Sequence, residues 1–142
     1  MAAGMTWSGA RLRPQSSPRK RVLVVDENPQ DLRGCVDTLT RAGYHVSGCS
    51  SIAEGTRSLE AGVFGLIIVS QGTVAFEGRP LLERSIEMNR RVPVFVVTPS
   101  VDMACYLDAM QLGARDYIEK PVSGEQLLRI VANFCPPSAT AA

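Results

Sequence analysis

The segment "GLIIVSQG", from Gly65 to Gly72, has the pattern of a β-strand that is buried on both faces. Its four consecutive apolar residues are typical of a strand in a parallel sheet that helices cover on both sides. The first polar side chain after the apolar run is Ser70. We therefore expect Ser70 at the carboxyl end of a strand, where open α/β sheets carry their functional groups.

Four further segments of the same kind predict four more strands. They are RVLVV (Arg21–Val25), YHVSGC (Tyr44–Cys49), PVFVV (Pro93–Val97) and RDYIEK (Arg115–Lys120). Between and after these strands, apolar residues recur at spacings of three and four residues, which predicts five helices. The predicted helices begin near Asn28, Ser50 or Ser51, Pro80, Asp102 and Gly124.

Strict alternation of strands and helices predicts parallel strands that are joined by right-handed crossovers. The helices then cover both faces of the sheet, and the architecture is a three-layer α/β sandwich. In such a sheet, the loops at the carboxyl ends of the strands form the site. The polar residues predicted in those loops are Asp26, Glu27, Ser70, Thr98 and Lys120.

The composition is that of one globular domain. The 142 residues are 45% hydrophobic and 20% charged, with a formal net charge of +1. This balance provides no broad basic surface for direct binding to nucleic acid or to an anionic membrane. No apolar run approaches the roughly 20 residues of a membrane span, and the N-terminus lacks the apolar stretch of a secretory signal. We therefore expect a cytoplasmic protein.

Both ends of the chain lack apolar periodicity. Residues 1–19 are predicted to form a disordered tail and residues 20–135 the folded domain, while residues 136–142 are predicted to be a C-terminal tail or the remnant of a linker. The four cysteines are far apart and only one histidine accompanies them, so we expect reduced, mostly buried thiols and neither disulfides nor a zinc site.

Four segments of the sequence resemble a known family. They are VLVVDENPQDL, GLIIVS, PVFVVTPS and GARDYIEKPV. Together they resemble the receiver domain of bacterial response regulators in two-component signalling, over about Arg21 to Phe134. The resemblance implies a non-enzymatic signalling module with a flavodoxin-like fold, in which a doubly wound, five-stranded parallel sheet has the order 2-1-3-4-5 and carries five helices.

The resemblance assigns metal and phosphoryl chemistry to the first and third strand ends. Asp26 and Glu27 match the acidic pair that holds Mg²⁺, and Ser70 occupies the position of the phosphorylated aspartate. A serine hydroxyl is a poor nucleophile without a base, and the loss of a carboxylate removes one of the oxygen ligands that Mg²⁺ prefers. We therefore expect a degenerate acceptor position and a weak Mg²⁺ site.

The resemblance also assigns a switch. Thr98 matches the hydroxyl that contacts the phosphoryl group, Tyr117 the aromatic side chain that turns inward with it, and Lys120 the invariant lysine. Each residue also has a purely structural interpretation. Thr98 and Tyr117 can be a strand-end hydroxyl and edge packing, and Lys120 can neutralise the pair of Asp26 and Glu27 in the resting protein.

Pro99 and Val74 depart from the family pattern. The family usually has a small residue after the switch hydroxyl, and its backbone N–H helps to bind the phosphoryl oxygens. Proline has no N–H and restricts Thr98 to extended conformations. Val74 stands where the family commonly has a proline. These departures also indicate a degenerate phosphorylation pocket.

Two functions remain open from the sequence. One is a phosphorylation-independent receiver that acts through protein contacts. The alternative is a receiver that is still phosphorylated, on Ser70 or on a nearby side chain such as Thr73. The implied partners are a histidine kinase, a phosphotransfer protein or an output domain, and a homodimer is possible through residues 102–134. The predicted contact residues on that surface are Tyr106, Met110, Arg115, Glu119 and Gln126.

Overall fold

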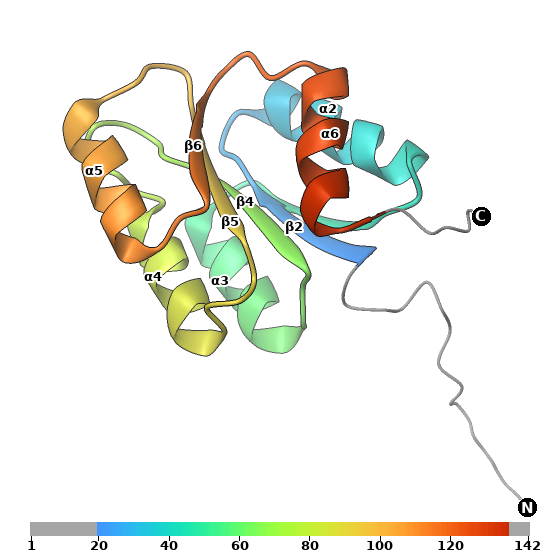
Figure 1. The fold of residues 1–142 in the computed structure, drawn as a ribbon, viewed down its shortest axis with the longest axis horizontal. Coiled ribbons are helices and arrows are strands. Elements are labelled where there is room, and N and C mark those ends of the chain that lie inside the picture. Colours follow the sequence, from blue (N-terminus) through green and yellow to red (C-terminus); the bar gives the residue numbers. More distant parts are fainter. Residues whose placement is uncertain (1–19, 137–142) are drawn as a thin grey trace, which may run out of the picture.

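The computed structural model of the protein describes residues 20–136, in which five parallel strands form one sheet (Figure 1). The strands are β2 (Arg21–Val25), β3 (His45–Cys49), β4 (Leu66–Ser70), β5 (Val94–Thr98) and β6 (Asp116–Glu119). Their spatial order is β3-β2-β4-β5-β6, which confirms the predicted order 2-1-3-4-5. The predicted tails lie outside the described residues, except for Pro136.

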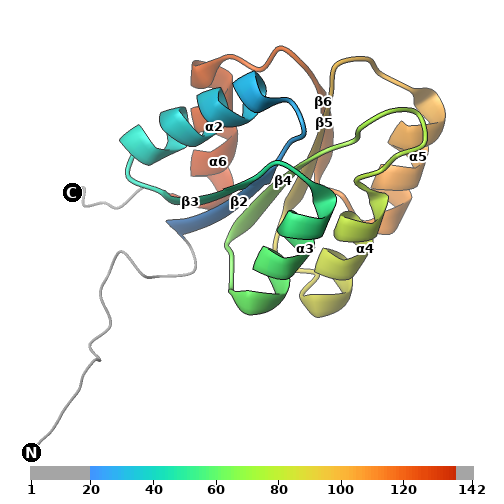
Figure 2. The ribbon, with the colours of Figure 1, turned by 180° about the vertical axis from the view of Figure 1, so that it is seen from behind.

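Five helices connect and follow these strands within the described part of the chain. They are α2 (Pro29–Arg41), α3 (Ile52–Ala61), α4 (Arg79–Met88), α5 (Met103–Leu112) and α6 (Gly124–Phe134). Helices α2 and α6 cover one face of the sheet, and α3, α4 and α5 cover the other (Figures 1 and 2). This arrangement confirms the three-layer sandwich. None of these five helices is long and apolar enough to cross a membrane.

The helix ends follow the predicted capping signals. Asn28, Ser51 and Asp102 each accept hydrogen bonds from backbone N–H groups in the first turn of their helix. Gly113 ends α5 in the left-handed region, with φ of 112°. Helix α4 ends at Met88, and the following Asn89 is extended, with φ of −165°.

The sheet separates two apolar cores. In β2, Leu23 and Val25 pack into the core beneath α3, α4 and α5, whereas Val22 and Val24 pack into the core beneath α2 and α6. All five residues of β4 are buried, as the opening segment predicts. Because successive side chains of a strand point to opposite faces, two-sided burial requires a continuous apolar run.

No disulfide joins the four cysteines, all of which lie within residues 20–136. Cys49, Cys105 and Cys135 are buried, and Cys35 is half-buried on α2. Burial, with a smaller contribution from the negative charge of Asp26, raises the pKa of Cys35 to about 12. The thiol of Cys35 is therefore neutral at physiological pH.

Candidate functional site

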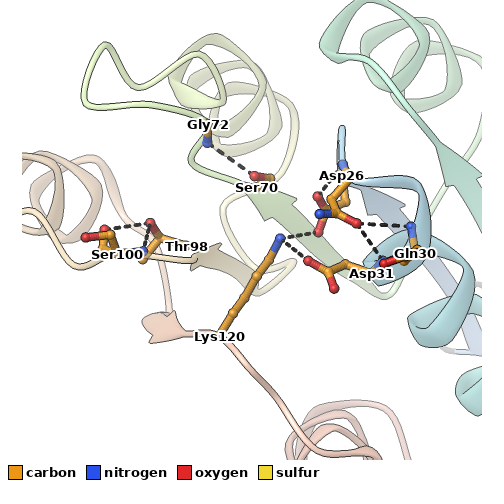
Figure 3. Close-up of polar contacts among 9 residues, drawn as sticks. Asp26, Gln30, Asp31, Ser70, Gly72, Thr98, Ser100 and Lys120 are labelled. Carbon is orange, nitrogen blue, oxygen red and sulfur yellow. Dashed lines mark hydrogen bonds and ion pairs between the residues drawn. The ribbon is translucent and has the colours of Figure 1, made fainter.

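The carboxyl edge of the sheet brings together polar residues from four strands (Figure 3). Asp26 follows β2, Ser70 and Thr98 end β4 and β5, and Lys120 follows β6. The parallel register places Val69 beside Val25, and Ser70 beside Val97. Asp26, Ser70 and Thr98 are at most 5% exposed although they are polar. Such buried polar groups need partners, and the contacts of each define the site.

Lys120 forms ion pairs with two carboxylates. Its Nζ lies 2.9 Å from Oδ2 of Asp26 and 2.9 Å from Oδ2 of Asp31. The side chains of Lys120 and Asp26 are 13% and 6% exposed, so water screens this pair little. Burial alone would lower the pKa of Lys120, but the hydrogen bonds with Asp31 and Asp26 raise it above its usual value. Lys120 is therefore charged.

The prediction that Lys120 neutralises the acidic pair is correct for Asp26 and wrong for Glu27. The second carboxylate on Lys120 belongs to Asp31, in the first turn of α2. Glu27 is exposed in the loop before that helix. The side chain of Asn28 begins α2 by accepting hydrogen bonds from the N–H groups of Gln30 and Asp31, and this cap brings Asp31 to the edge of the sheet.

The residues at this edge fit a Mg²⁺ ion only in part. Oδ1 of Asp26 accepts a hydrogen bond from the Asn28 N–H at 3.0 Å, and Oδ2 pairs with Lys120. Within residues 20–136, no group of three His, Cys, Asp or Glu side chains is placed to hold a metal ion. The resemblance assigns Mg²⁺ to Asp26 and Glu27, and an ion there would have to compete with Lys120 for Asp26.

Ser70 is enclosed by the loop that follows β4. Its Oγ accepts a hydrogen bond from the N–H of Gly72 at 3.2 Å. Gly72 has φ of +84°, which favours glycine. A Cβ on Gly78 would lie 2.2 Å from the backbone oxygen of Ser70, so the start of α4 can approach the strand end only because residue 78 is glycine.

The hydroxyl of Thr98 is engaged within its own loop. Oγ1 donates to the carbonyl of Ser100 at 2.8 Å and accepts from the Ser100 N–H at 3.2 Å (Figure 3). Thr98 is 1% exposed. The predicted switch hydroxyl therefore has both a donor and an acceptor in the loop that leads to α5.

Tyr117 links three parts of the carboxyl edge. Its hydroxyl donates to Oε1 of Gln71 and accepts from the Asp102 N–H at 3.1 Å. Gln71 is 2% exposed, and its Nε2 donates to the carbonyl of Thr73 at 3.1 Å. The loop after β4, the N-cap of α5 and strand β6 are thereby joined by one hydrogen-bonded chain.

Two residues of this site, Gln71 and Asp31, lie outside the predicted set. Gln71 carries a weak signal, since it is a polar residue directly after a buried strand. Asp31 carries a second weak signal, because an acidic residue in the first turn of a helix lies near the end of the preceding strand. Neither signal identifies the partner of the side chain.

The predicted contact surface is only partly exposed. Tyr106, Arg115 and Glu119 are exposed, whereas Met110 and Gln126 are half-buried. The prediction of exposure is wrong for Met110 because its side chain packs against the core beneath α5. Gln126 is half-buried in the first turn of α6.

Arg115 also has a structural role. Its guanidinium carbon lies 4.8 Å from the centre of the Phe134 ring, and that ring lies 5.5 Å from the ring of Phe95. A cation over an aromatic face is attracted to it, so Arg115 helps to hold the end of α6. Substitution of Arg115 will therefore affect both packing and any partner contact.

The family model of the response regulator receiver domain matches residues 22–132 of the chain. The chain belongs to this family. A receiver domain protein from Methanospirillum hungatei, described as CheY-like, superposes with a TM-score of 0.76 at 27% identity, over 80% of this chain and 91% of the other. The receiver fold predicted from the sequence is therefore confirmed.

Curated relatives support the same family. The C4-dicarboxylate transport transcriptional regulatory protein DctD of Rhizobium meliloti is 29% identical over 109 residues, which are 76% of this chain and 24% of DctD. The two-component response regulator ARR18 of Arabidopsis thaliana is 33% identical over 115 residues, which are 78% of this chain and 17% of ARR18. This receiver domain thus spans about a quarter or less of these two relatives.

Proposed function

We propose that this receiver domain is an atypical one, which signals through protein contacts and accepts no phosphoryl group at the usual position. Ser70 carries the proposal, because it ends β4, where the resemblance places the phosphorylated aspartate. The residue is 2% exposed, and its Oγ is bound by the Gly72 N–H. With serine at this position, the carboxylate that would attack phosphohistidine is missing.

The surroundings of Ser70 offer no histidine base. A serine hydroxyl becomes an effective nucleophile when a neighbouring base accepts its proton. The single histidine of the chain, His45, pairs in register with Arg21 at the amino end of the sheet. Ser70 lies at the carboxyl end of the same parallel sheet, so His45 cannot assist it. Deep burial of Ser70 also opposes its modification by a serine kinase.

The loop after β5 supports the proposal. Pro99 follows Thr98 and offers no N–H to a phosphoryl oxygen. The Thr98 hydroxyl already donates to Ser100, so a phosphoryl group would have to break that hydrogen bond. We infer that the pocket has lost phosphoryl-binding groups at two strand ends.

The same reasoning predicts weak binding of Mg²⁺. Asp26 and Glu27 supply two carboxylates where the family supplies three, and hard cations bind more weakly as charged oxygen ligands are removed. Lys120 further reduces affinity because it occupies Oδ2 of Asp26. In the resting protein, the ion pair with Lys120 neutralises the buried charge of Asp26.

The surface of residues 102–134 is proposed to rest in one dominant state. A ligand shifts an equilibrium only by its difference in affinity for the two states, and a pocket without a phosphoryl group provides no such difference. The hydrogen bond from Tyr117 to Gln71 ties β6 to the loop after β4. A histidine kinase, a phosphotransfer protein, an output domain or a second copy would then bind this surface in a cytoplasmic pathway.

The test is an incubation of the full chain with acetyl phosphate and Mg²⁺, followed by intact mass. The proposal expects no phosphoryl addition. A stoichiometric addition would support the alternative function, and Ser70→Ala and Thr73→Ala would then locate it. Thr73 is the competing acceptor because it is exposed and its hydroxyl contacts the Glu77 carboxylate.

A further inference from the structure

A cavity of about 290 Å³ lies between α2 and α6. Its floor is the apolar face of the sheet, and one end reaches the carboxyl edge. The size is just below the range of about 300–1,000 Å³ for small-molecule pockets, which suits one ring and a short chain. The residues that matter for its chemistry are Asp26, Asp31, Gly34, Phe95, Val97 and Lys120.

Gly34 of α2 lines the cavity and leaves its wall open. A Cβ on Gly34 would have no atom within 4 Å, whereas a Cβ on Gly124 would already touch Thr38 at 3.6 Å. Gly34 is exposed, and a larger side chain at this position would enter the open space.

The floor of the cavity is apolar. Phe95 and Val97 of β5 line it and keep 4% and 7% of their surface exposed. Little of their surface is left to cover, but Ile118 and Ile130, which are half-buried, also line the cavity. A ligand that covers this lining removes apolar surface from water, which favours an apolar body.

The rim of the cavity is negatively charged. Asp26 and Asp31 contribute two negative charges and Lys120 one positive charge, which leaves one net negative charge. Oδ2 of each carboxylate forms an ion pair with Lys120, and Oδ1 of Asp26 accepts a hydrogen bond from the Asn28 N–H. The side chain of Asp31 is 45% exposed, so Asp31 is the accessible acid of the rim (Figure 3).

We propose that this cavity binds a small organic cation, with an ammonium or amidinium group on a single apolar ring and a short chain. The cationic group pairs with Asp31 at the rim, and the ring covers Phe95 and Val97. An organic anion would meet two carboxylates and would have to displace both from Lys120. The charge of the rim therefore excludes it, and the inference holds whether or not Ser70 is ever phosphorylated.

Three probes of matched size test whether the charge of a ligand determines its affinity for the cavity. The ¹⁵N-labelled full chain is titrated with 2-phenylethylamine, 2-phenylethanol and 3-phenylpropionate, and amide shifts are followed. We expect saturable shifts around Gly34 and Lys120 with millimolar affinity for the amine, and about fivefold weaker binding of the alcohol, as for one partly exposed ion pair. The propionate should bind most weakly. Absence of saturable shifts at the cavity, or equal binding of amine and propionate, would overturn the proposal.

Two substitutions test whether the amine binds in this cavity. Gly34→Leu puts a side chain into open space and should weaken binding of the amine by about tenfold or more, because the amine loses apolar contact with the cavity. Thr40→Leu, at an exposed position of α2 outside the cavity, should change the affinity by less than about twofold. Asp31→Asn should reduce the affinity for the amine to that for the alcohol. Unchanged amine binding in both Gly34→Leu and Asp31→Asn would contradict the inference.

Discussion

Lys120 and Asp26 form an ion pair with an N–O distance of 2.9 Å, at a strand edge where the side chains are 13% and 6% exposed. The pair neutralises the buried charge of Asp26, while Asp31, the second partner of Lys120, leaves one net negative charge among these three residues. Burial of two charges is costly, and their mutual attraction offsets that cost only while both partners remain, so loss of one partner leaves an uncompensated charge.

We predict that Lys120→Met lowers the free energy of unfolding by about 3 kcal/mol, because Asp26 then remains buried without its cation. Urea denaturation followed by circular dichroism measures this loss. Arg129→Met, at an exposed position of α6, is the matched control and should change stability by less than about 0.5 kcal/mol. Equal effects of the two substitutions would show that the Lys120 pair is not stabilising.

Ser70→Asp should strengthen Mg²⁺ binding, because it restores a third carboxylate beside Asp26 and Glu27. Isothermal titration calorimetry should give only weak binding for the parent chain and tighter binding for the variant. Ser70→Asn keeps a similar side-chain shape without the charge and should resemble the parent. Micromolar Mg²⁺ affinity in the parent, or no gain in Ser70→Asp, would contradict the proposed metal site.

Tyr117→Phe should lower the free energy of unfolding by about 1–3 kcal/mol, because Oε1 of the buried Gln71 loses its donor. It should also allow β6 and the start of α5 to sample more than one arrangement, which relaxation dispersion would detect. Tyr106→Phe removes a hydroxyl from an exposed ring of α5 and serves as the control. Similar dispersion in both variants would argue against Tyr117 as the link.

Arg115→Glu should weaken self-association or partner binding through residues 102–134. It should also reduce stability by about 0.5–1 kcal/mol, because the cation above Phe134 is lost. Phe134→Leu removes the ring and keeps the charge of Arg115. Sedimentation of the two variants therefore distinguishes the loss of packing from the loss of a partner contact. Ser70→Ala should leave association unchanged. If Ser70→Ala abolished association and Arg115→Glu had no effect on it, the function would depend on the pocket around Ser70 and not on this surface.

The carboxyl of Glu77 should titrate below its usual 4.5, because the backbone N–H of Thr73 and then its hydroxyl bind the charged form and lower the pKa. The loop therefore gains stability above the usual pKa and loses it as the pH falls through the lowered value. A ¹³C titration of the carboxyl checks this. Thr73→Val removes only the hydroxyl and should raise the pKa part of the way towards the usual value.

The fold could be predicted because its signals are local. The apolar run before Ser70 and the capping residues Asn28 and Asp102 each determine a strand or a helix end by themselves. Several side-chain partners could not be predicted in this way. Asp31 reaches Lys120 because of the geometry of the α2 cap, and the side chain of Gln71, after β4, reaches Tyr117 of β6 across the intervening strand β5. Such contacts depend on the packed structure and leave no periodic pattern.

We propose that Ser70 abolishes phosphoryl transfer at this position while the surrounding fold remains intact. The most direct measurement compares the parent chain and Ser70→Asp in one incubation with acetyl phosphate and Mg²⁺, by intact mass. We expect no phosphoryl addition to the parent and partial, acid-labile addition to Ser70→Asp. The variant should hold the phosphoryl group only weakly because Pro99 offers no N–H to its oxygens. Acid-labile addition to the parent, at a level equal to that of the variant, would contradict the proposal.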